Sequence, residues 1–545
     1  VSPWALRTGG PTPEMRCWWL LVALALPRGS SGDSLLRHHA VLLSTGSHET
    51  RLSLYSESGG SIEGHTLGKI VPGLRNYIGQ HNIPRAVAAL LPLFEKVKKL
   101  VPKVELARTR VFVYGTAGMR ELQQTEFEEL WNGLYESLRE LGPQKFPFLL
   151  RREDFQVLTG EREGFFAGLA VNWLLERINA GAEPITCAAA ASQHLVGAFD
   201  LGSTSAQLAS PLKQAGCDDL PGQRRGRTRS RRLRESDFWS VSLETYGIDE
   251  VFEAVTTFIS ENLKEEGGAN PCFNAGISLD ALHVGEDRQI RAEGNGPACR
   301  EMISLAIWGD QDSKCLRDHS FCLLDGIAVA RRAHRSEFVA MRSSYTVIDV
   351  LRQHSPKGLP SWPTPPLEEI RASADALCAM PWGDLSRSAV HEPANDWNSL
   401  ARLLPELCLK ANYISVLWRG MGFEPNSRNV LFAANLRDTH VDWTVGAALE
   451  YFSKMAYRRP QSHDWNADVM DMLALGAMTC LMFVTCYFVI VQAKFLYQWL
   501  GPRGKSVQGF AKKVDATPEN ADEETRGESH KAPGESKTRS DEAPK

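Results

Sequence analysis

The sequence lacks several features that would point directly to a function. Its 61 Lys and Arg residues nearly balance its 65 Asp and Glu residues, and only 23% of its residues are charged. A net charge of −4 gives no general attraction to nucleic acid, so we expect no nucleic-acid partner. No Asn-x-Ser/Thr acceptor is present to report on topology by glycosylation. The eleven cysteines include no Cys-x-x-Cys pair and no His partner at zinc-finger spacing.

What the sequence does contain is a set of short segments rich in glycine and hydroxyl side chains. Three of them follow apolar runs that predict β-strands, at residues 40–43, 111–114 and 196–199. A strand that ends at Gly-Ser or Gly-Thr presents bare backbone N–H groups and small hydroxyls, which suits a polyphosphate, although ordinary hairpins use the same turns. The four segments are Leu43-Ser44-Thr45-Gly46-Ser47, Gly115-Thr116-Ala117-Gly118-Met119-Arg120, Gly160-Glu161-Arg162-Glu163-Gly164 and Asp200-Leu201-Gly202-Ser203-Thr204-Ser205-Ala206-Gln207.

In this order, the segments resemble those of the apyrase family of nucleoside triphosphate diphosphohydrolases, the ecto-nucleotidases. The family patterns are Asp-Ala-Gly-Ser-Ser, Ala-Thr-Ala-Gly-Met-Arg, Gly-x-Glu-Glu-Gly and Asp-Leu-Gly-Gly-Ala-Ser-x-Gln. This chain matches the last three well and departs from the first. The resemblance runs from Ala40 to about Phe452 and includes Asn270-Pro271-Cys272 and Asp442-Trp443-Thr444-Val445-Gly446. It implies an α/β protein with a two-lobed, duplicated actin/hexokinase-like (ribonuclease H-like) fold, whose phosphate site lies in the inter-lobe cleft.

A chain of 545 residues is long enough for two or more lobes. We expect a first lobe at residues 40–158, to which residues 432–455 return, and a second, disulfide-stapled lobe at residues 159–431. Apolar residues at helical spacing predict three helices. They lie near Pro84–Leu100, near Thr125–Leu141 and, after a loop that contains Glu163, at Phe165–Ile178.

The resemblance also implies catalytic roles. Glu163 would be the general base, and Ser205 and Gln207 would orient the attacking water. Asp200 would hold Mg²⁺ or Ca²⁺ through its water shell, because hard cations prefer carboxylate and water oxygens. Each carboxylate and amide also has an ordinary structural explanation: a glutamate near a helix N-terminus, a turn aspartate, a strand glutamine facing solvent. Phosphate contacts are implied for Gly46, Ser47, Thr116, Gly202, Ser203 and Thr204.

Two further residues match family positions that sandwich the nucleobase. These are Tyr345, in Ser343-Ser344-Tyr345-Thr346, and Arg419, in Arg419-Gly420-Met421-Gly422-Phe423. An aromatic ring and a guanidinium bind any base by stacking, so we expect loose base selectivity. The alternative for Tyr345 is a plain core residue.

The first segment departs from the family pattern. Ser44 stands where the family has an aspartate, which removes one of two carboxylates around the cation. His48-Glu49 follows, and a glutamate at the loop tip would repel a phosphate by about 1 kcal/mol or more. Ser203 replaces a glycine and would crowd the terminal phosphate. We therefore expect low activity, an altered cation preference, or no activity.

Residues 472–491 contain no charged residue and are long enough for a helix across a bilayer of about 30 Å. Asp468 and Asp471 precede this segment and Lys494 follows it, so the positive-inside rule places the disordered tail, residues 494–545, in the cytosol. The alternative is a buried core helix.

The N-terminal region predicts entry into the secretory pathway. Residues 15–31 resemble a signal peptide or an uncleaved anchor, and residues 1–14 could be upstream sequence. We therefore expect the body of the protein to be lumenal or extracellular.

Cysteine usage agrees with an oxidising compartment. Six cysteines fall late in the body, and sequence alone allows fifteen pairings of six. Buried free thiols or a zinc site are the alternatives. The family pattern implies the successive pairs Cys272 with Cys299, Cys315 with Cys322, and Cys378 with Cys408.

The sequence thus predicts a membrane-anchored nucleotidase that hydrolyses terminal phosphates of nucleoside tri- and/or diphosphates with Mg²⁺ or Ca²⁺. One alternative is a catalytically impaired relative that binds nucleotides or partners. Another is a different member of the actin-like superfamily, such as a sugar kinase or exopolyphosphatase.

Overall fold

The computed structural model describes residues 37–179, 186–187, 195–212, 233–262, 268–278, 291–309, 323–324, 327–328, 337–388, 397–458 and 465–499. The chain divides into two units, Val1–Gln461 and Ser462–Lys545. The predicted signal segment, Cys315, Cys322 and most of the C-terminal tail lie outside the described residues.

The first unit contains two five-stranded sheets, and the N-terminal sheet has the order β3-β2-β1-β4-β5. β1 pairs antiparallel with β2, which pairs antiparallel with β3, whereas β4 lies parallel to β1 and β5 parallel to β4. A continuous apolar run at residues 40–43 makes β1 a central strand that is buried on both faces. The strands are β1 (His38–Thr45), β2 (Thr50–Ser58), β3 (Ser61–Ile70), β4 (Arg110–Gly115) and β5 (Phe155–Val157).

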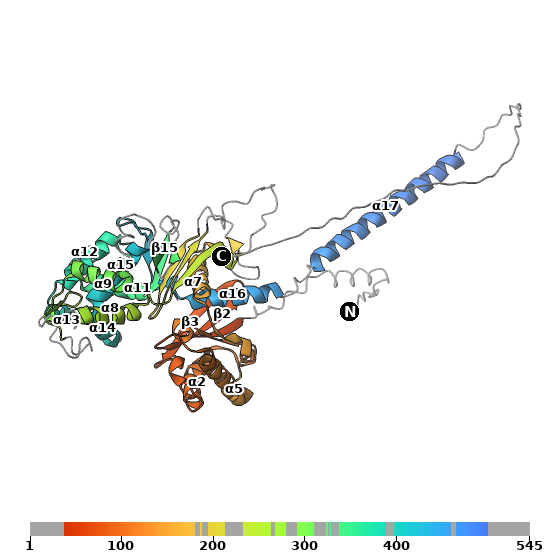
Figure 1. Cartoon of the computed structure of the whole chain (residues 1–545). Coiled ribbons are helices and arrows are strands. Elements are labelled where there is room, and N and C mark those ends of the chain that lie inside the picture. Colours follow the sequence, from red (N-terminus) through yellow and green to blue (C-terminus); the bar gives the residue numbers. More distant parts are fainter. Residues whose placement is uncertain are drawn as a thin grey trace, which may run out of the picture. The chain divides into compact units, whose positions relative to one another are not determined.

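The second sheet repeats this topology, with the order β10-β9-β8-β15-β16. Its first three strands are again antiparallel, and β15 and β16 again continue the sheet in parallel. The same order and sense in both sheets confirm the predicted duplicated α/β fold (Figure 1). The strands are β8 (Gly197–Leu201), β9 (Ala206–Pro211), β10 (Phe238–Leu243), β15 (Phe338–Arg342) and β16 (Val430–Phe432).

Helices α2 (Ile83–Leu100) and α5 (Gln124–Glu140) pack beside the first sheet, within one or two residues of their predicted bounds. Their apolar stripes contact each other and the strands, with Phe94 and Trp131 fully buried. A capping box between Gln123 and Glu126 fixes the start of α5.

Helices α7 (Gly160–Leu174) and α16 (Trp443–Arg458) connect the two sheets. α7 packs on β8, β9 and β10, while α16 packs on α7 and also contacts β1 and β2 (Figure 1). The two helices approach closely because Gly446 has no side chain: a Cβ there would lie 1.9 Å from the backbone oxygen of Phe166. One buried cluster contains residues of both sheets and both helices, so this pair joins the two halves.

The predicted bounds of α7 are wrong at both ends. The helix begins at Gly160, so Glu163 lies in its first turn and not in a preceding loop. Thr159 caps it by accepting a hydrogen bond from the Arg162 N–H, and acidic residues in a first turn are favoured by the helix dipole. The helix ends at Leu174, before Glu176 adopts a φ of 57°.

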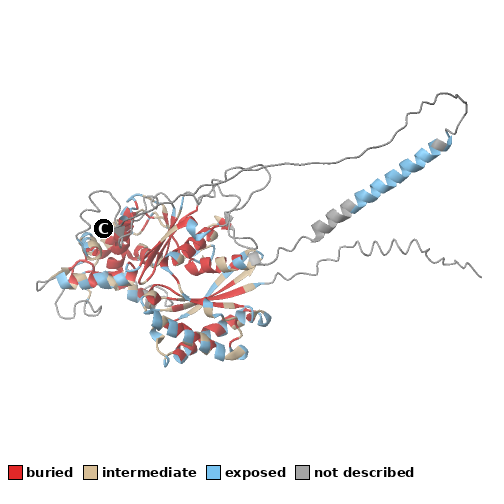
Figure 2. Cartoon of the chain, turned by 45° about the vertical axis from the view of Figure 1, so that its right-hand side comes forward, coloured by how far each residue is buried: buried red, intermediate tan, exposed pale blue. Residues whose placement is uncertain are grey.

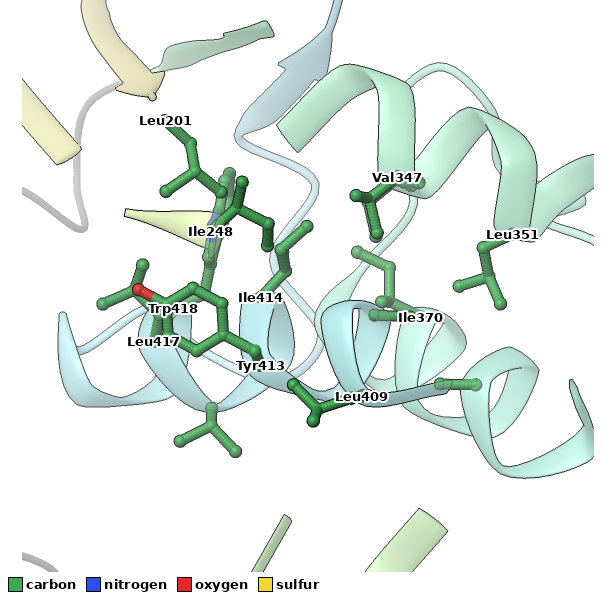
Figure 3. Packing of buried hydrophobic residues seen from close by; sticks show 14 of the residues in the cluster. Leu201, Ile248, Val347, Leu351, Ile370, Leu409, Tyr413, Ile414, Leu417 and Trp418 are labelled. Atoms are coloured by element: carbon green, nitrogen blue, oxygen red, sulfur yellow. The ribbon is translucent and has the colours of Figure 1, made fainter. Parts of the chain in front are cut away.

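The second sheet packs against a helical layer around α15 (Leu407–Gly420), which is buried almost throughout (Figure 3). Leu409, Tyr413 and Leu417 of α15 lie in this core. Disulfides link Cys272 to Cys299 and Cys378 to Cys408, as the family pattern implies. The remaining helices of the layer include α8 (Ile248–Asn262), α9 (Gly296–Trp308), α11 (Ser343–His354) and α12 (Leu367–Cys378).

The described part of the second unit is the single helix α17 (Trp465–Trp499). Its residues Gly476–Leu496 are long and apolar enough to cross a membrane, and none of this stretch is buried (Figure 2). The stretch overlaps the predicted span at residues 472–491. By length and composition, α17 is a candidate membrane helix.

Candidate active site

A cavity of about 280 Å³ opens between the ends of the strands of the two sheets. It collects residues from all four glycine- and hydroxyl-rich segments. All six residues predicted to contact phosphate line it, together with Glu163 and Ser205. The lining comprises Ser44, Gly46, Ser47, His48, Glu49, Arg51, Thr116, Ala117, Glu163, Gly202, Ser203, Thr204, Ser205, Arg342, Ser343, Thr346, His440 and Asp442.

The two strand-end turns that face the cavity have the same backbone bond. The N–H of Gly46 donates to the carbonyl of Glu49 at 3.0 Å, and the N–H of Gly202 donates to that of Ser205 at 2.9 Å. The glycine N–H groups therefore close the turns, and any phosphate must be met by other groups of the loops. The loops meet where the hydroxyls of Ser47 and Thr204 lie 3.0 Å apart.

The segment at residues 115–120 lies beside these two turns and completes a cradle with them. The N–H of Thr116 donates to the carbonyl of Thr45 at 3.0 Å, which ties the segment to the first turn. Gly118 lies so close to Ser47 that a Cβ would fall 2.5 Å from the Ser47 backbone. The second glycine of this segment is therefore required by the close approach of two loops.

Glu163 lies at the inner wall of the cavity, with only 2% of its side chain exposed. Its Oε2 lies 3.2 Å from Nη1 of Arg120, and its Oε1 lies 3.8 Å from Nη1 of Arg342. Burial raises the pKa of Glu163 to about 7, although Arg120 opposes the rise. A carboxyl that titrates near neutral pH is suited to general-base chemistry.

Ser205 and Gln207 form one hydrogen-bonded unit beside Glu163. Gln207 Nε2 donates to Ser205 Oγ at 2.6 Å and to Ser242 Oγ at 2.9 Å. Gln207 is 1% exposed, so it is not a strand residue facing solvent. Gln207 does not line the cavity, but its buried Oε1 has no hydrogen-bond partner among the described residues, which leaves an acceptor for a water molecule.

Asp200 does not line the cavity but lies fully buried behind it. Burial raises its pKa to about 6, while the nearby Arg342 guanidinium opposes the rise. Arg342 Nη1 is 3.5 Å from Asp200 Oδ1. Neither carboxylate oxygen has a hydrogen-bond partner among the described residues.

Several charged residues of the site were assigned no role from sequence, among them Arg120, Asp442 and Arg342. Arg120 ends the second motif, and it contacts Glu163, Ser205 at 3.3 Å and Glu244 at 2.9 Å. Asp442 begins the closing motif and caps α16 by accepting the Thr444 N–H at 2.8 Å. Both residues lie inside matched motifs, so the motifs could have identified them as site residues. Arg342 lies outside the matched motifs, and only the fold brings it to the cavity.

The expected repulsion by Glu49 is not what the structure shows. Glu49 lies 2.7 Å from Arg51 and 2.6 Å from Lys69 of β3. Although burial alone would raise it, these two cations hold the pKa of Glu49 below its ordinary value. The negative charge at the loop tip is therefore compensated by partners that are brought to it by the β2–β3 hairpin.

Tyr345 and Arg419, the predicted nucleobase contacts, do not line this cavity. Tyr345 lies in α11 between Ser344 and the cavity-lining Thr346, and its ring centroid lies 5.8 Å from that of Trp362. Arg419 lies in the last turn of α15 and is exposed. No hydrogen bond or cation–π contact joins Tyr345 to Arg419 within the described part of the chain.

The predicted divalent-cation site does not fit the residues present. The oxygens of Asp200 have suitable chemistry, but the Arg342 guanidinium already faces them. Asp442 lies 3.8 Å from Arg51, and Ser44 offers no carboxylate. Among the residues that the structure describes, no three His, Cys, Asp or Glu side chains are grouped to hold a metal ion. Each acid near the cavity thus faces an arginine.

Comparisons with known proteins agree with this architecture. The guanosine-diphosphatase of Schizosaccharomyces pombe is 23% identical over 467 residues, which cover 80% of this chain and 76% of that protein. Ectonucleoside triphosphate diphosphohydrolase 1 of Bos taurus is 23% identical over 521 residues, which cover 88% and 93%. The crystal structure of nucleoside triphosphate hydrolases from Neospora caninum shares the fold, with a TM-score of 0.54 at 15% identity over 81% of this chain and 97% of that one. Residues 33–463 match the family as a whole, and the chain therefore belongs to the GDA1/CD39 (nucleoside phosphatase) family.

Proposed function

We propose that this protein hydrolyses the terminal phosphate of nucleoside tri- and/or diphosphates. The observation that carries the proposal is the cavity itself, which gathers Glu163, Ser205 and the six predicted phosphate-binding residues from four separate segments of the chain. The similarity to a guanosine-diphosphatase and to a triphosphate diphosphohydrolase supports the same chemistry.

In the proposed reaction, Glu163 accepts one proton from a water molecule. The water oxygen forms a bond to the terminal phosphorus, and the bond from that phosphorus to the bridging oxygen breaks. The electron pair leaves with the bridging oxygen on the shortened nucleotide. Ser205 and the free Oε1 of Gln207 hold the water, and hydroxyls and N–H groups of the two turns hold the phosphates.

Mg²⁺ or Ca²⁺ would neutralise phosphate charge if it entered with the nucleotide. Since the residues around Asp200 do not fit such an ion, we derive no step through it. Because Ser44 replaces the aspartate of the family pattern, the protein would need a cation less, or would hydrolyse nucleotides more slowly. The experiment below distinguishes an active enzyme from an impaired relative that only binds nucleotides.

We further propose that Tyr345 and Arg419 lie near the nucleobase, with little selectivity among bases. The protein would be anchored by α17, with its body in the lumen of the secretory pathway or outside the cell. The two disulfides, Cys272 with Cys299 and Cys378 with Cys408, support an oxidising compartment.

The test is Glu163→Gln in the full-length chain. We expect phosphate release from ATP, ADP, UDP and GDP to fall by about 10² to 10⁴-fold, because the general base is lost. Nucleotide binding should be nearly unchanged. Glu161→Gln is the matched control, since Glu161 lies in the same turn of α7 but is exposed. Near-native turnover of Glu163→Gln would rule out Glu163 as the base, and a wild type without turnover would indicate a binding protein.

A further inference from the structure

Arg342 occupies an unusual backbone position at the edge of the cavity. It is the last residue of β15 and directly precedes α11. Its φ of 56° and ψ of −123° lie in a region that a residue with a side chain rarely adopts. Such strained positions concentrate at ligand-binding and catalytic sites, because the surrounding structure must hold them in place. This geometry gives a first reason to look for a role of Arg342.

The side chain of Arg342 lines the same cavity as the two phosphate-facing turns. Its ion pairs, 3.5 Å to Asp200 and 3.8 Å to Glu163, are long. Arg120, the other arginine beside Glu163, donates at 2.9–3.3 Å to four protein acceptors. The protein therefore fixes Arg120 firmly, whereas among the described residues Arg342 has only the two long ion pairs of its Nη1, which leaves its other guanidinium N–H groups to a ligand.

A terminal phosphate that enters this cavity meets several carboxylates. Arg51 and Lys69 neutralise Glu49, and Arg120 contacts Glu163. A guanidinium matches two phosphate oxygens in a planar fork and keeps its charge at every relevant pH. In a partly desolvated site, a fixed positive group at the transferred phosphate stabilises the charge of the transition state.

We propose that Arg342 binds the terminal phosphate directly and supplies, as a side chain, the positive charge that the sequence assigned to a divalent cation on Asp200. Asp200 is then a positioning residue that holds the guanidinium. This inference rests on the proposed nucleotidase function. It implies that nucleotide binding and phosphate release persist when divalent cations are chelated.

The experiment uses the full-length chain in detergent with excess EDTA. Equilibrium dialysis measures the Kd of a non-hydrolysable nucleoside triphosphate analogue, and a second assay measures phosphate release from ATP and ADP. We expect wild type to bind and hydrolyse in EDTA. Arg342→Gln should weaken binding by about tenfold to a hundredfold and slow release by about 10³-fold or more. Arg139→Gln, which removes an exposed arginine on α5, should change neither.

A second variant keeps the test valid if Arg342→Gln unfolds, since the buried Asp200 would lose its partner. Arg342→Lys retains the charge but not the planar fork, and we expect it to fall between wild type and Arg342→Gln in both assays. Thermal unfolding of each variant identifies loss of fold.

The outcomes separate the two proposals. If folded Arg342→Gln or Arg342→Lys binds the analogue in EDTA as wild type does, the inference is overturned, while phosphate release by wild type still supports the nucleotidase function. If wild type binds and releases phosphate only with added Mg²⁺ or Ca²⁺, the inference is also overturned. If wild type binds through Arg342 but hydrolyses nothing, the proposed function fails and the binding role of Arg342 stands.

Discussion

Glu163 sits between charges that set the pH at which it can accept a proton. Burial raises its pKa to about 7, above the ordinary 4.5, with Arg120 opposing and Asp200 adding to the rise. A protonated carboxyl cannot act as a base, so kcat/KM should rise as pH increases through about 7 and level off above it. The measurement is phosphate release from pH 5 to 9. A rate that falls over this range as pH rises would contradict the assignment.

Ser44 is the other residue of the cavity whose identity decides chemistry. It lies one residue before the end of β1, where the family pattern has an aspartate, and it lines the cavity. Ser44→Asp should raise the rate or create a stimulation of phosphate release by Mg²⁺ or Ca²⁺, because it places a carboxylate, the ligand that hydrated cations prefer, where wild type has a hydroxyl. Ser44→Asn is the uncharged control. If both quantities stay at wild-type values, the first motif has no role in cation use.

Residue identities predicted the cradle but not its charge balance. Gly46, Thr116 and Ser203 could be placed at one site because each follows or lies in a matched motif. The neutralisation of Glu49 could not be predicted, since its partner Lys69 is twenty residues away and reaches it only through strand pairing. Arg342 could not be found either, because no local pattern distinguishes it.

At the scale of elements, the packing of α7 against α16 depends on Gly446. Gly446→Ala would place a methyl group 1.9 Å from the backbone oxygen of Phe166, so the helices must separate. We expect a loss of about 1 to 3 kcal/mol or more in the free energy of unfolding, measured in urea, together with reduced activity because α7 carries Glu163.

The control for Gly446→Ala is Gly383→Ala in α13 (Trp382–Ser388). A Cβ at Gly383 meets only Arg387 at 3.6 Å, an ordinary contact. Alanine favours a helix over glycine by about 1 kcal/mol or less, so this variant should be neutral or slightly stabilised. Equal stability of the two variants would show that the α7–α16 contact tolerates separation.

Element types were easier to predict than element ends. Apolar periodicity located α2 and α5 to within one or two residues. The start of α7 was missed because Gly160 and Gly164 suggested a loop, whereas the cap at Thr159 and packing on β10 keep this glycine-containing turn helical. The start of such a helix is difficult to predict, because the tertiary contacts that stabilise it cannot be recognised in the local sequence.

For the whole molecule, the proposed topology makes a direct prediction. Asp468 and Asp471 precede the apolar stretch of α17 and Lys494 lies near its end, so the body should lie on the non-cytosolic side. A protease added to sealed vesicles from the cytosolic side should remove only the tail beyond about Lys494. The control is detergent, which should expose the body. Digestion of the body in intact vesicles would reverse the orientation.

The matching turns at Gly46 and Gly202 also have an evolutionary consequence. Each turn is closed by a bond between backbone atoms, and Ser44 and Asp200 each lie one residue before the end of the strand that precedes the turn. Duplication therefore left two copies of a loop whose shape tolerates substitution at that position. One half keeps the acid, Asp200, and the other carries the hydroxyl of Ser44. A carboxylate can therefore be exchanged for a hydroxyl at this position without a change in the fold of the turn. The charges of the site can change in evolution while the architecture stays the same.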